Sequence, residues 1–342
     1  MPERPLILVD PQPRTLDMIC DAPTRARLEA LGRLVVHEDG RMPAELVERH
    51  LPEAVAMIGQ TDLPAERVAR AERLRAVINV EGNLLPNVDY EACFDRGIHV
   101  LVASGAFATA VAEAALGMAI DLARGITAAD RAMRARTERW GLDSNAGAFL
   151  LSGSPVGIVG FGDLGRALRR LLGPFGCPVR VHDPWLPDLV VRREGGQPVE
   201  LDELLATSRV VFVLAAATTE NERMIGAREL ALMQPGSALL VLSRAAVVDF
   251  GALADAVRAG HVRAASDVFE DEPLAPDDPL RDLDGLLLSP HRSGGMPEAF
   301  REIGRLAVAD LELILRGLPP VACRRAERET AGRLRSRPVA RS

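Results

Sequence analysis

The chain has 342 residues, of which 48% are hydrophobic, and carries a formal net charge of −7. Its length suits two ordinary globular domains, and its apolar content is enough to fill both cores. No dense basic stripe precedes the last twenty residues, which argues against nucleic acid as a partner because phosphate binding needs clustered positive charge. All basic side chains other than histidine are arginines, and the absence of lysine excludes Schiff-base chemistry and a phosphate-loop lysine.

The cysteines are scattered, without the paired spacing of a zinc site or a disulfide framework. They are Cys20, Cys93, Cys177 and Cys323. We expect reduced, mostly buried thiols and no metal site. The N-terminal residues lead directly into the apolar run Leu6–Val9, which is too short for a signal sequence or a membrane span. These features predict a cytoplasmic protein with no membrane partner.

Short apolar runs alternate with helical patterns, which is typical of a doubly wound α/β architecture with parallel strands. The pattern occurs twice along the chain. The first set of strands is expected at Leu6–Val9, Leu34–His37, Ala54–Ile58, Ala76–Val80 and Ile98–Val102. Next, the apolar face of Thr109–Arg124 predicts a long helix at the domain junction, followed by an arginine-rich helical extension at Ala128–Trp140.

The second set begins with a strand at Pro155–Val159 that ends in a glycine-rich turn and opens a helix. Gly160 permits a tight turn, Gly162 lets the backbone approach a pyrophosphate, and Gly165 brings the helix close to the strand. Asp183 lies at the tip of the next apolar run, where it would accept hydrogen bonds from ribose hydroxyls. The predicted NAD-binding residues are Gly160, Phe161, Gly162, Asp163, Leu164, Gly165 and Asp183.

Later strands are expected at Val179–His182, Val210–Leu214, Ala238–Leu242, Val262–Ser266 and Leu286–Leu288. The carboxyl ends of such strands line the ligand crevice of a doubly wound sheet. Arg244, Glu272 and His291 follow three of these ends, so we expect them to converge near the cofactor. A histidine paired with a carboxylate supplies a proton near neutral pH, and an arginine fixes a carboxylate and polarises a carbonyl group.

The end of the chain predicts a helix at Pro297–Arg316 that crosses back to the first domain. The expected domains are residues 1–104 with 297–325, and residues 105–296. Residues 326–342 are rich in arginine and poor in apolar side chains, which predicts a mobile tail. A partner-binding arm is the alternative.

Several short segments occur in an order and spacing typical of one family. They are Asn87–Tyr90, Arg96–Ile98, Ala110–Glu113, the glycine turn, Asp183, Arg244 followed by Val248-Asp249, Asp267–Phe269 with Glu272-Pro273, and Ser289–His291. Through them nearly the whole chain resembles the D-isomer-specific 2-hydroxyacid dehydrogenases.

The resemblance implies a flavodoxin-like substrate domain, a Rossmann NAD-binding domain and a homodimer built on the second domain, for which the extension at Ala128–Trp140 is a candidate interface. It assigns substrate binding to Arg244, proton exchange to His291 and support of that histidine to Glu272. The further cofactor contacts that it implies are Thr218, Ser243 and Asp267, and the substrate contacts are Glu81, Gly82 and Asn83.

Glu81 departs from the family pattern, because it brings a negative charge close to where the substrate anion binds. Three solutions stay open. The side chain turns to solvent, it pairs with an arginine such as Arg244, or it hydrogen-bonds hydroxyl or amino groups on a substrate larger than glyoxylate or pyruvate. The third solution predicts a preference for acids that carry such groups beyond the reacting carbon.

Together, these features predict an NAD-dependent oxidoreductase that interconverts a small D-2-hydroxy acid and its 2-keto acid by hydride transfer. Two alternatives stay open, oxidation of another small anion such as formate or phosphite, and a nucleotide-sensing regulator on the same fold. The presence of Arg244, Glu272 and His291 argues against the regulator, because sensing alone does not need all three.

Overall fold

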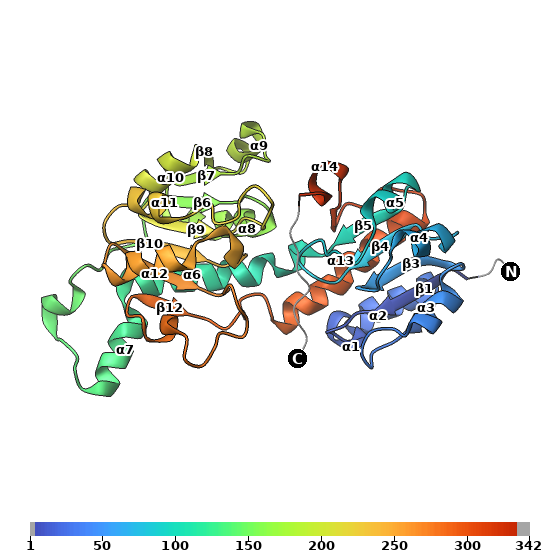
Figure 1. The fold of residues 1–342 in the computed structure, drawn as a ribbon, viewed down its shortest axis with the longest axis horizontal. Helices are drawn as coiled ribbons and strands as arrows, with labels where there is room; N and C mark the ends of the chain where they lie inside the picture. Colours follow the sequence, from blue (N-terminus) through green and yellow to red (C-terminus); the bar gives the residue numbers. More distant parts are fainter. Residues whose placement is uncertain (1–3, 334–342) are drawn as a thin grey trace. The chain divides into compact units, whose positions relative to one another are not determined.

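The computed structural model describes residues 4–333, which form two compact units (Figure 1). Of these residues, the first unit comprises 4–107 and 295–333, and the second comprises Ala108–Gly294. The chain therefore passes from one unit to the other twice. The two crossings expected from the sequence, after residues 104 and 296, lie within three residues of the crossings in the structure, after residues 107 and 294.

The first unit is built on a six-stranded sheet in the order β13-β5-β4-β3-β1-β2, in which only β13 is antiparallel to its neighbour. The order β2-β1-β3-β4-β5 is that of a flavodoxin-like sheet, as predicted. Its strands are β1 (Leu6–Asp10), β2 (Arg33–Val36), β3 (Ala54–Gly59), β4 (Ala76–Asn79), β5 (His99–Val102) and β13 (Arg324–Arg325). Its helices are α1 (Leu16–Ile19), α2 (Ala22–Leu31), α3 (Ala44–His50), α4 (Ala65–Arg70), α5 (Tyr90–Asp95), α13 (Pro297–Leu315) and α14 (Arg328–Ala331).

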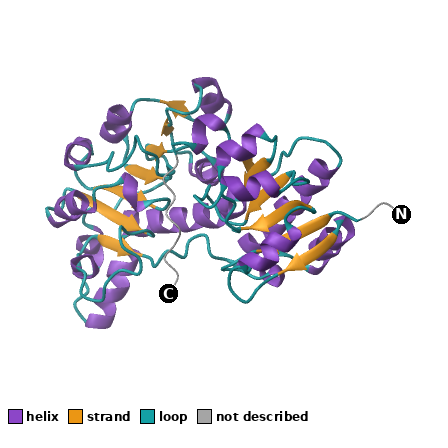
Figure 2. Ribbon diagram, turned by 45° about the vertical axis from the view of Figure 1, so that its right-hand side comes forward, coloured by secondary structure: helices purple, strands orange, loops and turns teal. Residues whose placement is uncertain are grey.

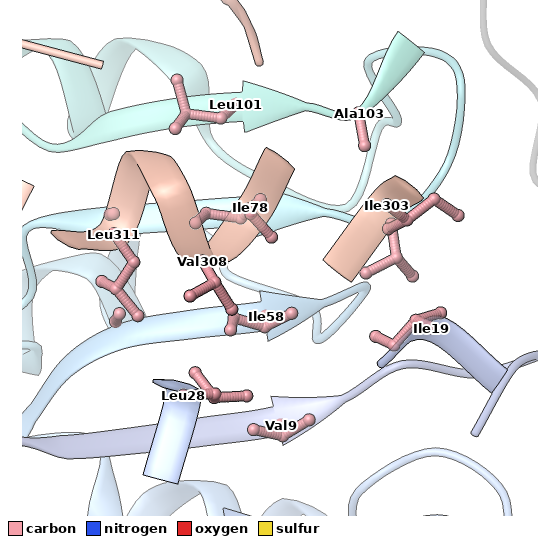
Figure 3. Close-up of a cluster of buried hydrophobic side chains, with 14 of the residues drawn as sticks. Val9, Ile19, Leu28, Ile58, Ile78, Leu101, Ala103, Ile303, Val308 and Leu311 are labelled. Atoms are coloured by element: carbon pink, nitrogen blue, oxygen red, sulfur yellow. The ribbon is translucent and has the colours of Figure 1, made fainter. Parts of the chain in front are cut away.

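Strands β1 and β3 are buried along their whole length because helices cover both faces of the sheet, as Figure 2 shows. Parallel strands in this position are continuous apolar runs, which is why the sequence located them. On one face, α13 contributes Ile303, Val308 and Leu311 to a core cluster that also contains Ile58 and Ile78 (Figure 3).

The described residues beyond α13 pack on the first unit. β13 pairs with β5, and α14 packs on α5, where Arg328 forms ion pairs with Glu91 and Asp95. The prediction of a mobile tail is therefore wrong for residues 326–333, because the arginine that suggested a solvated segment meets two carboxylates of α5. The rest of that prediction falls on residues 334–342, which lie outside the described residues.

Asp310 of α13 holds the segment that leads to β13. Its fully buried carboxylate accepts hydrogen bonds from the backbone N–H groups of residues 321–323, at 2.7 to 2.8 Å. Asp310→Ala removes the acceptor for all three N–H groups, so we expect the free energy of unfolding to fall by about 3 kcal/mol or more.

Urea and thermal unfolding measure this loss. The control is Glu312→Ala on the same helix, which removes a partly exposed ion pair with Arg27 and is expected to lower stability by less than about 1 kcal/mol. Equal losses in the two variants would contradict the role of Asp310.

The second unit is built on a seven-stranded parallel sheet in the order β12-β11-β10-β9-β6-β7-β8, the predicted Rossmann arrangement. Its strands are β6 (Val156–Val159), β7 (Val179–His182), β8 (Gln197–Pro198), β9 (Val210–Val213), β10 (Ser237–Val241), β11 (Val262–Ser266) and β12 (Leu286–Leu288). Its helices are α6 (Ala108–Arg124), α7 (Ile126–Ala135), α8 (Asp163–Leu172), α9 (Asp188–Arg193), α10 (Leu201–Thr207), α11 (Ala227–Leu232) and α12 (Phe250–Arg258).

Helix α6 packs against α8, β10 and β11, with Val111, Ala115 and Leu122 buried. The stretch Ser104–Arg124 is long and apolar enough to cross a membrane by length and composition alone. A buried core helix has the same properties, and the contacts of α6 within the second unit are those of a core helix.

Helix α7 is shorter than the expected extension. It ends at Ala135, because Arg136 adopts a left-handed backbone with φ of 60° that terminates the helix. The extension that was predicted to reach Trp140 as a helix therefore continues as a loop after residue 135.

Candidate active site

The glycine turn between β6 and α8 is tightly packed at Gly160 and Gly165 and leaves the backbone accessible at Gly162. Gly160 has φ of +89°, and a Cβ on it would lie 2.4 Å from the Cα of Ala215. A Cβ on Gly165 would lie 2.6 Å from the carbonyl oxygen of Gly160, whereas one on Gly162 would meet no described atom within 4 Å. Gly162 directly precedes α8, so this open position lies at the N-terminus of the helix, where backbone N–H groups and the helix dipole favour an anion such as a pyrophosphate.

Asp183 lies beside the glycine turn, directly after β7. Its Oδ2 accepts a hydrogen bond from the N–H of Phe161 at 2.7 Å, and its Oδ1 accepts one from the N–H of Trp185 at 3.0 Å. These bonds fix the carboxylate and leave lone pairs for a ribose diol. Of the other predicted contacts, the side chain of Phe161 is buried in the core, and Asp163 and Leu164 open α8.

Thr218 and Ser243 are buried residues that follow β9 and β10 at the same edge of the sheet. The N–H of Thr218 donates to Oδ1 of Asn221 at 2.7 Å. The backbone oxygen of Ser243 accepts a hydrogen bond from Nη1 of Arg244 at 2.6 Å, and Arg244 opens a 3-10 turn at Ala245–Val247.

Asp267, directly after β11, has a contact pattern that the sequence did not predict. Its buried carboxylate accepts hydrogen bonds from the N–H groups of Arg292 and Ser293, both at 3.0 Å, and from the hydroxyl of Ser289. All three donors belong to the segment that carries His291. The Ser289-Pro290-His291 motif identifies this segment in the sequence, but nothing in the motif indicates which carboxylate holds it.

His291 and Glu272 form the hydrogen-bonded pair expected from the sequence. Nδ1 of the half-exposed imidazole lies 2.6 Å from Oε2 of Glu272. The other carboxylate oxygen, Oε1 of Glu272, accepts a hydrogen bond from the N–H of Phe269 at 2.9 Å. With Nδ1 donating to the carboxylate, Nε2 remains for a ligand. His291 has φ of +47°, a left-handed conformation that is uncommon for a residue other than glycine.

The electrostatics of the pair favour its charged form. The hydrogen bond and charge of Glu272 raise the pKa of His291 despite burial. Burial raises the pKa of Glu272, but the hydrogen bonds from His291 and the Phe269 N–H outweigh it and lower the pKa overall. The charge of Arg244 lowers the pKa of both groups, so the guanidinium acts within electrostatic reach of the pair. The structure thus joins His291 and Glu272 directly, and the catalytic roles of these two residues and of Arg244 stay predictions.

Glu81, Gly82 and Asn83 follow β4 in the first unit. Glu81 forms an ion pair with Arg14, with 2.8 Å between Oε1 and Nη1. The structure thus confirms that Glu81 pairs with an arginine, but the partner is Arg14 and not Arg244, and the side chain of Glu81 is only partly exposed to solvent. Arg14 follows β1 by four residues at the same edge of the sheet, so the strand-end rule applied to β1 would have included it.

No group of three or more histidine, cysteine, aspartate or glutamate side chains between residues 4 and 333 is placed to hold a metal ion. The chemistry of the described residues is that of a glycine turn at a helix start, an acidic residue after the next strand and a histidine–glutamate pair at later strand ends. This combination defines a dinucleotide-binding α/β domain with an acid–base pair.

Comparison with known proteins identifies the family. Residues 116–293 match the model of the D-isomer specific 2-hydroxyacid dehydrogenase NAD-binding domain. The chain belongs to the D-isomer specific 2-hydroxyacid dehydrogenase family, and its second unit is the NAD-binding domain, as predicted.

Relatives of several kinds cover most of the chain. A D-3-phosphoglycerate dehydrogenase of Archaeoglobus fulgidus is 32% identical over 81% of this chain, which spans only 53% of that protein. A glyoxylate reductase of Thermofilum pendens is 31% identical over 88% of this chain and 91% of its own length. The crystal structure of a phosphoglycerate oxidoreductase from Rhizobium etli has 45% identity and a TM-score of 0.86, over 96% of this chain and 99% of that one. The chain thus spans about half the length of the first of these relatives.

Proposed function

We propose that the protein is an NAD-dependent oxidoreductase that interconverts a small D-2-hydroxy acid and its 2-keto acid. The observation that carries the proposal is the 2.6 Å contact between His291 and Glu272, in the same unit as the glycine turn and Arg244. Reduction of a 2-keto acid needs a proton donor near neutral pH and a cation that polarises the carbonyl group. We assign these roles to His291 and Arg244 of the second unit.

In this mechanism, the glycine turn and Asp183 would hold a nicotinamide nucleotide, which when bound would supply or accept the hydride. Arg244 binds the substrate carboxylate and stabilises charge that develops on the carbonyl oxygen. His291 delivers a proton from Nε2 to that oxygen during reduction and takes it back during oxidation. Glu272 orients the imidazole and stabilises its protonated form. We also propose that the loop after β4, which contains Gly82 and Asn83, binds the substrate carboxylate through its backbone.

The direct test is turnover of NADH with a panel of 2-keto acids that includes glyoxylate, pyruvate and hydroxypyruvate. NADH oxidation that depends on the keto acid and yields the D-hydroxy acid supports the proposal. Formate or phosphite oxidation without keto-acid reduction would replace it with another hydride-transfer reaction, and cofactor binding without any turnover would favour a regulator.

Cofactor preference follows from Asp183. We expect NADH to be used about 100-fold more efficiently than NADPH, because a carboxylate accepts hydrogen bonds from a ribose diol but repels a 2′-phosphate. Asp183→Ser should reduce this ratio by at least about tenfold. The control is Asp188→Ser, at an exposed aspartate that pairs with Arg192 on α9. A wild-type preference for NADPH would contradict the assignment.

We also propose a homodimer formed through α7 and the loop that follows it, which extend from the second unit (Figure 1). Trp140 and Leu142 are 76% and 93% exposed there, and large exposed apolar side chains in one segment mark an interaction surface. We expect a dimer in analytical ultracentrifugation and a monomer for Trp140→Asp/Leu142→Asp. Leu318→Asp, at an exposed apolar residue after α13, is the control. A wild-type monomer would contradict the proposal.

We propose a cytoplasmic location on the basis of the cysteines. All four are buried and unpaired, and burial raises the pKa of the Cys20 and Cys93 thiols to about 11. Free, unreactive thiols of this kind are typical of a reducing compartment.

A further inference from the structure

The first unit contains an ion pair at the edge of the sheet where the proposed substrate loop lies. Arg14 follows β1 and Glu81 follows β4, and the two guanidinium Nη atoms face the two carboxylate oxygens at 2.8 and 3.3 Å. Strand β3 lies between β1 and β4 in the sheet. The pair therefore bridges the carboxyl end of β3.

Packing holds Arg14 in place. Its side chain is only 11% exposed, its guanidinium lies 4.9 Å from the ring centre of Phe300 and 5.5 Å from that of Phe107, and Nη1 donates to the backbone oxygen of Val80 at 3.1 Å. A typical surface ion pair lacks such contacts and contributes little. The side chain of Glu81 is 28% exposed, so its carboxylate is fixed on one side by Arg14 and open on the other.

The same aromatic ring connects the pair to the substrate loop. A Cβ on Gly82, the residue after Glu81, would lie 3.3 Å from Cδ2 of Phe107. Phe107 thus packs both beside the guanidinium and behind the backbone that we propose binds the substrate carboxylate. The carboxylate of Glu81 consequently occupies a defined position next to that backbone.

Polar side chains at the neighbouring strand ends lack partners within the described part of the chain. Gln60, directly after β3, is 3% exposed, and neither of its amide atoms forms a hydrogen bond there. Asp10, at the end of β1, is also buried. Its Oδ2 accepts a hydrogen bond from the hydroxyl of Thr61 at 2.9 Å, whereas its Oδ1 has no hydrogen-bond partner among the described residues. The strand order reverses between β1 and β3, where open α/β sheets bind ligands. Buried polar atoms without partners at this point favour a ligand with hydrogen-bonding groups.

The charge at these strand ends is unfavourable for a second anion. Arg14 is already neutralised by Glu81, and Arg41 pairs with Asp62, 2.7 Å away. Asp10 adds a carboxylate that is not compensated by an ion pair among the described residues. A phosphate group at these strand ends would lie near the carboxylates of Asp10 and Glu81. The two arginines named here already form ion pairs, so neither would offset this repulsion.

We propose, building on the proposed function, that the Arg14–Glu81 pair with Gln60 is a specificity site for the part of the substrate beyond the reacting carbon. It selects 2-hydroxy and 2-keto acids that carry a neutral hydroxyl group there. The carboxylate of Glu81 accepts a hydrogen bond from that hydroxyl, while the positive charge of Arg14 offsets the repulsion between this carboxylate and the substrate anion. Phosphorylated acids are disfavoured at the same site.

Kinetics with NADH and three keto acids test this selection. We expect kcat/KM for hydroxypyruvate to exceed that for pyruvate and that for 3-phosphohydroxypyruvate by at least about tenfold each. Glu81→Gln should reduce the discrimination against the phosphorylated acid by about tenfold, because it removes the negative charge and keeps an acceptor. Glu81→Val should also abolish the preference for hydroxypyruvate over pyruvate.

A double-mutant cycle tests the role of Arg14. Arg14→Met leaves Glu81 without its cation, so we expect KM for every keto acid to rise by about tenfold. The double variant Arg14→Met/Glu81→Val should recover KM for pyruvate, which simple loss of packing would not produce. Glu48→Gln is the matched control, because this carboxylate also pairs with arginines and is 35% exposed, but it lies on α3 and not at a strand end.

Binding separates this proposal from the proposed function. Calorimetry with the NADH-bound protein and D-glycerate, D-lactate or 3-phospho-D-glycerate gives the same ranking without turnover. An inactive protein that still ranks D-glycerate first, with the ranking changed by Glu81→Gln, would reject the dehydrogenase function and keep the specificity site. A preference for the phosphorylated acid, or a ranking unchanged in Glu81→Gln and Glu81→Val, would overturn the specificity site whatever the activity.

Discussion

Replacing His291 by glutamine is expected to lower kcat for keto-acid reduction by about 10³-fold or more while leaving the Kd for NADH nearly unchanged. The imidazole is the proton donor in the proposed reaction, and glutamine retains a polar side chain without a transferable proton. Stopped-flow turnover and NADH fluorescence titration measure the two quantities. His261→Gln is the control, because His261 precedes β11 in the same unit and its Nε2 lies 3.2 Å from the backbone oxygen of Leu230, away from the proposed acid–base pair.

The pH dependence has a defined sign. Reduction requires the protonated imidazole, so its rate is highest below the raised pKa of His291 and falls as the pH rises through it. Oxidation of the hydroxy acid requires the neutral imidazole and shows the opposite trend. Glu272→Gln removes the charge that raises this pKa, so the fall in the reduction rate should move to lower pH by about one pH unit.

Two results would remove the pair from the mechanism. One is a His291→Gln variant with nearly normal kcat. The other is a Glu272→Gln variant whose reduction rate falls over the same pH range as that of the wild type.

Replacing Arg244 by methionine is expected to lower kcat/KM by about 10²–10³-fold, through both a higher KM and a lower kcat. One guanidinium serves the substrate carboxylate in the ground state and the carbonyl oxygen in the transition state. Arg244→Lys should recover only part of this loss, because an ammonium group lacks the two-pronged geometry of a guanidinium.

The same variant also gives a second readout. The charge of Arg244 lowers the pKa of His291, so Arg244→Met should shift the fall in reduction rate to higher pH. Arg258→Met is the control, because Arg258 forms an exposed ion pair with Asp255 on α12. A change in KM with neither a change in kcat nor a shift in the pH profile would restrict Arg244 to substrate binding.

The sequence predicts the two sheets well because their parallel strands are buried on both faces and form uninterrupted apolar runs. It does not predict β8 and β13, which are two residues long and contain Pro198 and two arginines instead of an apolar run. The position of β13 depends on the buried carboxylate of Asp310, which holds residues 321–323. Such a long-range contact has no local sequence pattern.

The candidate site, like the fold, is predicted only where a local sequence pattern marks its residues. Arg244, Glu272 and His291 are found because each follows a strand, and parallel strands bring their carboxyl ends together. Arg14 is missed because its partner Glu81 is 67 positions away and the contact requires two strands that are not neighbours in the sheet. The left-handed backbone of His291 is also missed, because this conformation is imposed by surrounding contacts on a residue type that rarely adopts it.

The hydrogen bonds of Asp267 have a mechanical consequence. The segment that they hold ends at Ser293, and the chain passes into the first unit between Gly294 and Gly295. Two consecutive glycines absorb backbone rotation easily, whereas the carboxylate of Asp267 fixes the residues just before them to the second unit. A backbone rotation at Gly294 or Gly295 therefore leaves the hydrogen bonds of Asp267 in place, and we expect the imidazole of His291 to keep its alignment with Glu272.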